Sequence, residues 1–346
     1  MILLREAKIT DLSALEDFSG AQGFYNLPDD MNMLTKKIEL SKKSFLESLK
    51  DINNAKYLFI AEDTETSKVV GTSLLVAKHG SQRSPHFYFQ VEQEERFSQM
   101  INTGFIHGTL KLKAETEGPT EIGGLIVAPS FRDNEAKVGR QIAFVRFLMM
   151  AMYPKKFQKK VLAELLPPFS AEGKSPLWEA VGKQFTNMDY WEADQLCQQN
   201  KEFIYELFPL EKIYTTLLPA EARSAIGGVA KETRPIYYML KKIGFEYQNQ
   251  VDPFDGGPHL WADVDNVTCI QNTSTYLFEG EKTDVKEVIE GLVCKKEQKK
   301  GEFRAVKMCV TLKDKKMFFI SSNEAQQAQD VLCIKKGDQL CFMPFY

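Results

Sequence analysis

The chain has 346 residues, of which 43% are hydrophobic and 26% are charged. This balance is typical of a protein that can bury a core, and the length allows two domains. A formal net charge of −3 excludes a strong overall field that would attract nucleic acid or an anionic membrane.

The N-terminus and the hydropathy pattern give no targeting or membrane signal. Arg5 and Glu6 follow a very short apolar start, and no stretch approaches 18 consecutive apolar residues. We therefore expect neither a signal peptide nor a membrane span, and a cytoplasmic protein.

Metal-ligand spacing is also missing from the sequence. The six cysteines form no CxxC pair, and the four histidines are scattered along the chain. We assign no role to His79, His86 or His107, and His259 is as well explained by packing as by a site. No bound metal is expected.

The first 115 residues predict a mixture of strands and helices. Residues 2–6 indicate a strand, Thr10 can cap a helix, and a second helix is expected over roughly 31–50. Apolar runs at 57–60 and 69–76 flank a polar turn and predict a hairpin. Residues 87–89 and 108–112 indicate two further strands, and the aromatic residues in 87–89 are most simply core.

Residues 120–164 read as strand, loop, long helix, strand. The strand over 121–127 contains Gly123 and Gly124 and ends at Pro129. The helix that follows carries apolar residues at three- and four-residue spacing from residue 138 to residue 152. A short strand over 161–163 then ends at Glu164, which completes a βαβ-like succession.

The loop before the long helix has the residues of a phosphate site. The first N–H groups of a helix are unpaired and carry partial positive charge, so they bind anions. Arg132, Lys137 and Arg140 add cations, and Gly139 permits close approach. An ordinary strand-to-helix connection with solvated charges remains the alternative, because one glycine is a weak signal.

The later part of the chain changes character near residue 268. Ser175 and Pro176 predict a helix start, a second helix begins at Thr233, and a turn spans 252–258. Beyond 268, helical periodicity fades and apolar strands alternate with lysine-rich turns at 313–316 and 335–338. We predict a large domain over 1–267 and a small β-domain over 268–346.

Several motifs together resemble one enzyme family. The stretch from residue 120 to Glu164 and the helix-to-strand junction at 240–246 resemble the GCN5-related N-acetyltransferase fold. More narrowly, the chain resembles arginine N-succinyltransferase over nearly its whole length. The matching motifs include residues 23–28 (GFYNLP), 57–71, 125–132, 161–164, 175–178 (SPLW), 254–258 (FDGGP) and 336–338.

The resemblance implies a fold, a reaction and a set of residues. The fold would be α/β, with a mixed, largely antiparallel sheet flanked by helices and a small C-terminal β-barrel-like domain. The reaction would transfer succinyl from succinyl-CoA to the α-amine of arginine in arginine catabolism, with no permanently bound cofactor. The expected coenzyme-binding residues are Leu125, Val127, Arg132, Lys137, Val138, Gly139 and Arg140.

The chain departs from the family at the expected proton donor. The resemblance places a histidine just before the helix at Thr233, where this sequence has Ala230. The glycine-rich loop is also shortened to 137–139, and Leu166 replaces part of the family pattern after Glu164. An alanine cannot transfer a proton, and acid–base help is worth about 10²–10⁴-fold in rate.

Other residues could carry the chemistry instead. Glu164 is the candidate catalytic base or ammonium partner, with a solvated strand-end acid as the alternative. Asp189, Asp252 and Asp255 could receive a cationic substrate, although Asp255 also suits a turn. Arg234 could bind a carboxylate or simply be a solvated cap residue.

Three functions stay open on the sequence. The first is the acyltransferase acting on arginine, and the second is the same enzyme with another amine. The third is a non-catalytic or regulatory subunit, which Ala230 would suit. The expected partners are small molecules and other subunits, as a homo-oligomer or with a paralogous chain.

Overall fold

The computed structural model describes residues 1–19, 30–82, 84–132, 134–197 and 200–345. The motif at 23–28 lies outside these ranges. By its internal contacts the chain divides into two compact units. Unit 1 comprises Met1–Ala77, Thr120–Lys159 and Val264–Tyr346, and unit 2 comprises Lys78–Pro119 and Lys160–Asp263. The division at residues 267 and 268 stays a prediction, and residues 264–346 group with the N-terminal strands.

Unit 1 is built on a mixed sheet in the order β12-β15-β11-β14-β13-β1-β2-β3-β6. Because β12 also pairs with β13, strands β11 to β15 close into a ring of hydrogen-bonded neighbours. In the whole sheet of unit 1, the strand pairs are antiparallel except for β11 with β14, which is parallel. The strands are β1 (Ile2–Glu6), β2 (Lys56–Asp63), β3 (Lys68–Val76), β6 (Thr120–Val127), β11 (Ser274–Lys282), β12 (Ile289–Lys295), β13 (Arg304–Lys313), β14 (Lys316–Ile320) and β15 (Gln339–Pro344).

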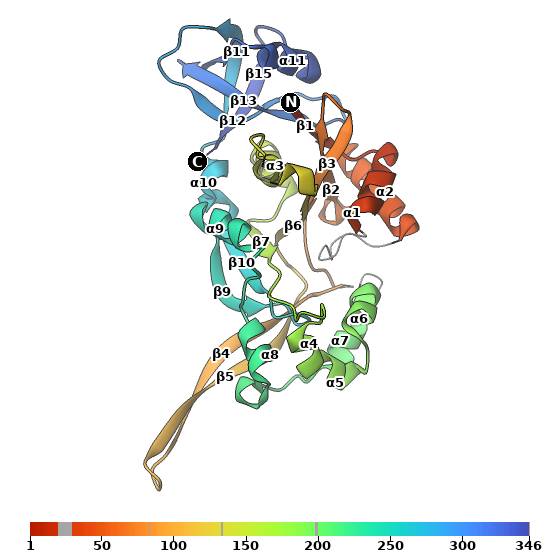
Figure 1. Cartoon of the computed structure of the whole chain (residues 1–346), viewed down its shortest axis with the longest axis vertical. Coiled ribbons are helices and arrows are strands. Elements are labelled where there is room, and N and C mark those ends of the chain that lie inside the picture. Colours follow the sequence, from red (N-terminus) through yellow and green to blue (C-terminus); the bar gives the residue numbers. More distant parts are fainter. Residues whose placement is uncertain (20–29, 83, 133, 198–199, 346) are drawn as a thin grey trace. The chain divides into compact units, whose positions relative to one another are not determined.

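Helices cover both faces of the β1–β3 part of this sheet (Figure 1). Leu58 and Ile60 of β2 pack with Leu34 of α2 on one face, whereas Ser73 donates a hydrogen bond to the carbonyl of Ile142 in α3. The helices of unit 1 are α1 (Leu12–Ser19), α2 (Met31–Phe45), α3 (Val138–Met152), α10 (Thr268–Gln271) and α11 (Asn323–Leu332), with 3-10 turns η1 (Ile9–Asp11), η2 (Ile52–Asn54), η3 (Pro129–Phe131), η4 (Pro154–Lys156) and η6 (Val264–Asn266).

Unit 2 is an antiparallel sheet in the order β7-β10-β9-β4-β5-β8 with short helices. Its β4–β5 hairpin is a long two-stranded arm (Figure 1). The strands are β4 (His86–Ser98), β5 (Thr103–Glu115), β7 (Lys160–Glu164), β8 (Ile213–Tyr214), β9 (Glu246–Val251) and β10 (Pro258–Asp263). The helices are α4 (Pro176–Ala180), α5 (Gly182–Thr186), α6 (Tyr190–Cys197), α7 (Glu202–Leu207), α8 (Ala220–Ala225) and α9 (Arg234–Lys242), with η5 (Thr215–Leu217).

Two of the sequence motifs meet in the core of unit 2. Ser175 caps α4 by accepting from the Trp178 amide, and its hydroxyl donates to the Phe254 carbonyl at 3.0 Å. The rings of Trp178 and Phe254 stack at 4.5 Å. Such an aromatic pair adds stabilisation beyond simple burial, so the 175–178 motif fixes the position of the turn that begins at Asp252.

The predicted α/β class with a mixed, largely antiparallel sheet is confirmed. The predicted loss of helices beyond residue 268 is wrong, because α10 and α11 lie there. The strands at 87–89 and 108–112 are also much longer than predicted, since most of the arm is polar or exposed and carries little hydrophobic signal. None of the helices in the described ranges is both long enough and apolar enough for a membrane span.

Candidate active site

Strand β6 contains a β-bulge at the predicted coenzyme-binding segment. Thr72 of β3 pairs with Ile126 and Leu74 pairs with Gly123, so one residue of β3 opposes two of β6. Gly124 lies in this bulge with φ +57°, and a Cβ there would lie 3.0 Å from the Leu74 side chain. A bulge re-aims the backbone groups of its strand, a feature common beside active sites.

Helix α3 begins at Val138, directly after a residue with a left-handed backbone. Lys137 is the N-cap with φ 49° and ψ 48°, and among the described side chains none caps this end. A left-handed backbone at a lysine costs on the order of 1 kcal/mol or more and is found where function requires a particular shape. The helix end therefore keeps its anion-binding N–H groups available.

The predicted cations around this helix end differ in exposure. Arg132 and Lys137 are exposed, and Arg132 Nε donates to the Val127 carbonyl at 3.1 Å. Arg140 is half-buried, with its guanidinium 4.5 Å from the centre of the Phe345 ring. Of the three predicted cations, Arg132 and Lys137 are therefore the most open to a ligand. Gly139 is half-buried and Val138 is buried.

A buried arginine supports the bulge from behind, and the sequence analysis missed it. Arg146 of α3 is 2% exposed, and its Nη1 donates to the Gly123 carbonyl at 3.2 Å while Nε donates to the Ala143 carbonyl at 3.0 Å. Burial lowers the pKa of Arg146 to about 9. Burying a charged group costs free energy unless hydrogen bonds compensate for it. Here the hydrogen bond from Arg146 fixes the carbonyl of Gly123, the residue before Gly124.

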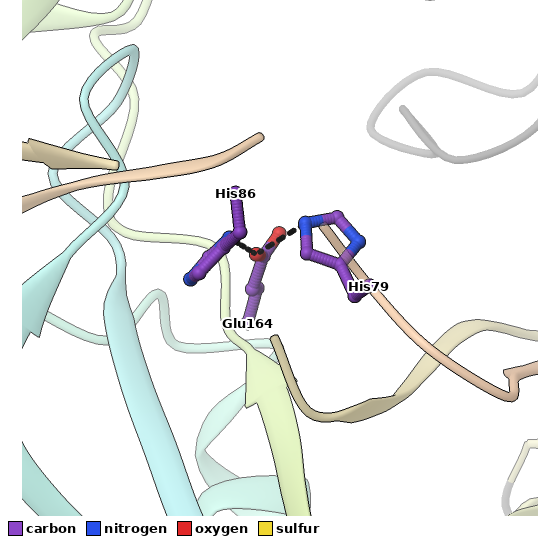
Figure 2. A group of neighbouring side chains, drawn as sticks. All are labelled: His79, His86 and Glu164. Atoms are coloured by element: carbon purple, nitrogen blue, oxygen red, sulfur yellow. Dashed lines mark ion pairs between the residues drawn. The ribbon is translucent and has the colours of Figure 1, made fainter. Parts of the chain in front are cut away.

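In unit 2, three histidines lie near Glu164 at the end of β7; Figure 2 shows two of them, His79 and His86. The nitrogens His79 Nε2, His86 Nδ1 and His259 Nε2 lie 3.9, 3.7 and 3.8 Å from Glu164 Oε1. His259 is the direct partner of Glu164 across the β7–β10 pairing. The histidines are scattered in the sequence, but strand pairing joins distant positions and brings three of them near one carboxylate.

Burial makes this cluster electrostatically unusual. His86 and His259 are 1% and 0% exposed, whereas the Glu164 side chain is 31% exposed. Burial, assisted by His79 and His259, holds the pKa of His86 well below its usual value. A neutral imidazole at pH 7 can accept a proton or coordinate a metal through its free nitrogen.

The predicted substrate residues Asp252 and Asp255 shape the turn before β10. Asp252 Oδ1 accepts from the amides of Phe254 and Asp255, and Asp255 Oδ1 accepts from the Gly257 amide at 2.7 Å. Burial raises the pKa of both carboxyl groups, and Asp252 raises that of Asp255 further. A Cβ on Gly257 would lie 2.0 Å from the Leu165 carbonyl, so the turn presses against the chain just after Glu164.

Ala230, at the position where the resemblance implies a proton donor, is tied to the same segment. Its amide donates to the Leu166 carbonyl at 3.0 Å, two residues beyond Glu164, and its carbonyl accepts from the amides of Thr233 and Arg234. Arg234 itself is exposed at the start of α9. The turn is therefore in place without a titratable side chain at residue 230.

Asp189 lies away from this arrangement. Its carboxylate pairs with Lys183 at 2.7 Å and is 75% exposed. The ion pair lowers the pKa of Asp189. The structure therefore brings Glu164, Asp252 and Asp255 to one region of unit 2 and leaves Asp189 on an exposed surface.

Comparisons with known proteins define the class of the protein as an acyltransferase. A family model described as arginine N-succinyltransferase beta subunit matches residues 2–269. The chain therefore belongs to the arginine N-succinyltransferase family.

Relatives and solved structures agree with this membership. The chain is 34% identical over 276 residues to proteins named arginine N-succinyltransferase from Citrobacter koseri and Escherichia fergusonii, covering 79% of this chain and 79% of each relative. It is also similar to the structure of arginine/ornithine succinyltransferase subunit AI from Pseudomonas aeruginosa. That likeness has a TM-score of 0.83 at 26% identity and covers 99% of this chain and 98% of the other.

Proposed function

We propose that the protein transfers the succinyl group of succinyl-CoA to the α-amine of arginine. The observation that carries this proposal is the family membership over residues 2–269, with relatives of that name aligned over 79% of this chain. Unit 1 has residues suited to binding the coenzyme, and unit 2 has residues suited to proton transfer and to binding the amine.

The coenzyme is proposed to bind at β6 and the start of α3. Its diphosphate would interact with the N–H groups of Val138 and Gly139 and with the exposed cations Arg132 and Lys137, while Arg140 contributes at longer range. Leu125 and Val127 lie on the half-buried side of the bulged strand. Their backbone groups are suited to the amides and the thioester carbonyl of an acyl-CoA.

The chemistry is the aminolysis of a thioester. The amine nitrogen attacks the thioester carbon, a C–N bond forms, the C–S bond breaks, and the coenzyme leaves as a thiolate. The substrate ammonium must first lose a proton to become a nucleophile, and the nitrogen loses a second proton, which water accepts, as the amide forms. We assign the first proton to Glu164, whose carboxylate is partly exposed and adjoins histidines that can pass a proton onward. Asp252, Asp255 and Arg234 are secondary proposals for acceptor binding.

A thiol-release assay tests the function. Purified chain is mixed with succinyl-CoA and arginine, ornithine, lysine or a polyamine, and free CoA is measured with a chromogenic disulfide. Release that is fastest with arginine supports the proposal. Glu164→Gln should lower the rate by about 10²-fold or more, with the exposed Glu172→Gln as the matched control. Fastest release with another amine would replace arginine as the acceptor.

One observation favours a second function, a non-catalytic subunit. Ala230 has no proton to give, although its backbone turn is intact. In that case the chain would bind succinyl-CoA in calorimetry and release no CoA with any amine. Activity that returns only when a paralogous chain is added would establish this alternative.

The setting of the enzyme is likewise proposed. Succinyl-CoA is the expected acyl donor, and the cytoplasm is the proposed location. An oligomer is proposed because the β4–β5 arm carries exposed apolar residues near its tip, namely Phe97, Met100, Ile101, Phe105 and Ile106. Large apolar residues exposed together at one hairpin tip commonly mark a protein interface.

A further inference from the structure

Two histidines and one carboxylate of unit 2 meet at a single point. His79 Nε2 lies 3.9 Å from Glu164 Oε1, and His86 Nδ1 lies 3.7 Å from the same oxygen. All three ligand atoms lie within 4.8 Å of one another. Figure 2 shows both rings turned toward the carboxylate from either side.

These distances exceed hydrogen-bond lengths but suit ligands of one shared ion. In a tetrahedral zinc site with bonds near 2.0–2.1 Å, neighbouring ligand atoms are roughly 3.3 Å apart. The two nitrogen–oxygen distances need to shorten by only about half an ångström to reach that value. We propose that His79, His86 and Glu164 form a binding site for one divalent transition-metal ion such as Zn²⁺.

The position of His86 gives an independent reason for a ligand. Its side chain is 1% exposed, and its Nε2 has no hydrogen-bond partner among the described residues. Burying an imidazole with so few polar contacts is costly. Coordination through Nδ1, the ring nitrogen that faces the Glu164 carboxylate, supplies a strong interaction for this ring.

The three residues leave room for a further ligand. His86 is closed off from solvent, whereas Glu164 and His79 are 31% and 19% exposed at their side chains. Three protein ligands with one open position are the pattern of zinc sites that bind water or a substrate. Two imidazoles and a carboxylate also suit Fe²⁺, Mn²⁺ and Co²⁺.

A neighbouring set of residues offers a second arrangement. Glu164, Asp252 and His259 also bring their ligand atoms within 4.8 Å of one another. We favour the first set because it contains two imidazoles, which bind Zn²⁺ well. Asp252 is in addition occupied by two backbone amides. The two sets differ in their histidines, so substitution separates them.

Metal binding is measured on the full-length chain after treatment with a chelator. Titration calorimetry with ZnCl₂ should give one ion per chain, and Co²⁺ should produce the visible absorption of a low-coordinate nitrogen–oxygen site. His79→Ala and Glu164→Gln should weaken binding by about tenfold or more, because loss of even an outer partner of a ligand costs about 10–100-fold. His107→Ala is the matched control, because that histidine lies outside the cluster and contacts Thr216.

Each outcome bears on the proposal. No binding by the wild type would overturn it, as would binding that survives both His79→Ala and His86→Ala. Loss of binding with His259→Ala alone would move the ion to the second set and contradict the assignment. Circular dichroism of each variant shows that the chain is folded. The readout is binding itself, so the result is independent of whether the chain transfers succinyl groups. An ion bound to Glu164 would occupy the proposed base, so the thiol-release assay uses metal-free chain.

Discussion

The substitution Arg146→Met tests whether the side chain that supports the β6 bulge matters more for the reaction rate than for the stability of unit 1. Methionine keeps an unbranched side chain in the core, shorter than that of arginine, but removes the donors to the carbonyls of Gly123 and Ala143. The Ala143 carbonyl lies within α3, whereas the Gly123 carbonyl is at the bulge. The variant therefore removes the side-chain support of the strand that is proposed to hold the acyl-CoA.

Two opposing terms set the change in stability. A buried carbonyl that loses its donor costs about 1–3 kcal/mol. Removing a buried cation whose pKa is lowered to about 9 is favourable, and replacing a buried charge by an apolar side chain is often neutral or stabilising. The net change in the free energy of unfolding should therefore stay within about 2 kcal/mol.

The change in rate should be larger than the change in stability. If the bulge carbonyl moves, the following amides no longer point at the thioester, and a misplacement near 1 Å can cost on the order of 10²-fold. We expect kcat for CoA release to fall about 10–100-fold. The matched control is Met149→Leu, a volume-conserving change in the same buried helix.

Thiol release and urea unfolding of the same preparations measure the two quantities. The reasoning would be refuted if Arg146→Met lost more than about 4 kcal/mol of stability, or if it kept the wild-type kcat. It would also be refuted if Met149→Leu lowered kcat as much, because general repacking of α3 would then explain the loss.

Three further predictions concern titration and assembly. Because the folded-state pKa of His86 lies below its unfolded value near 6.5, its neutral form stabilises the fold above about pH 6.5 and this contribution falls at lower pH. In His86→Phe, the urea midpoint should therefore fall less between pH 7 and pH 5 than it does in the wild type. An equal fall in both proteins would contradict this. The pKa of Asp255 is raised above its unfolded value, so its contribution is present at low pH and is lost as pH rises through the folded pKa. Asp255→Asn should gain more stability relative to wild type at pH 8 than at pH 5, and the reverse order would contradict this. Finally, Met100→Lys with Ile101→Lys at the arm tip, where Met100 is 95% exposed, should shift light scattering to a smaller species, and an unchanged mass would exclude the tip as an interface.

Much of the fold around α3 could be predicted because its signals are local. Pro129 ends a strand, and three- and four-residue apolar spacing marks the helix, which spans Val138–Met152 as expected. The Ser175 cap is also local and forms as predicted. Helix α11 was missed because its buried face consists mainly of Ala325 and Ala328, which give weak periodicity.

The histidine cluster could not be predicted, because it depends on strand pairing. His259 lies beside Glu164 because β10 pairs with β7 in that register. His86 is the first residue of β4, which pairs with β9, and β9 in turn pairs with β10. Arg146 was hidden for a different reason: an arginine inside an apolar helix pattern gives no sign of its carbonyl partner. Glu164 could be named from its place at a strand end, although its neighbours could not.

The central claim is the transfer of succinyl from coenzyme A to an α-amine, and mass spectrometry of the product tests it most directly. Full-length chain, arginine and isotopically labelled succinyl-CoA are incubated, and the amino acid is fragmented to locate the label. The account predicts labelled succinyl on the α-nitrogen of arginine, formed in step with CoA release. Unlabelled arginine in the presence of measurable succinyl-CoA binding would contradict the claim.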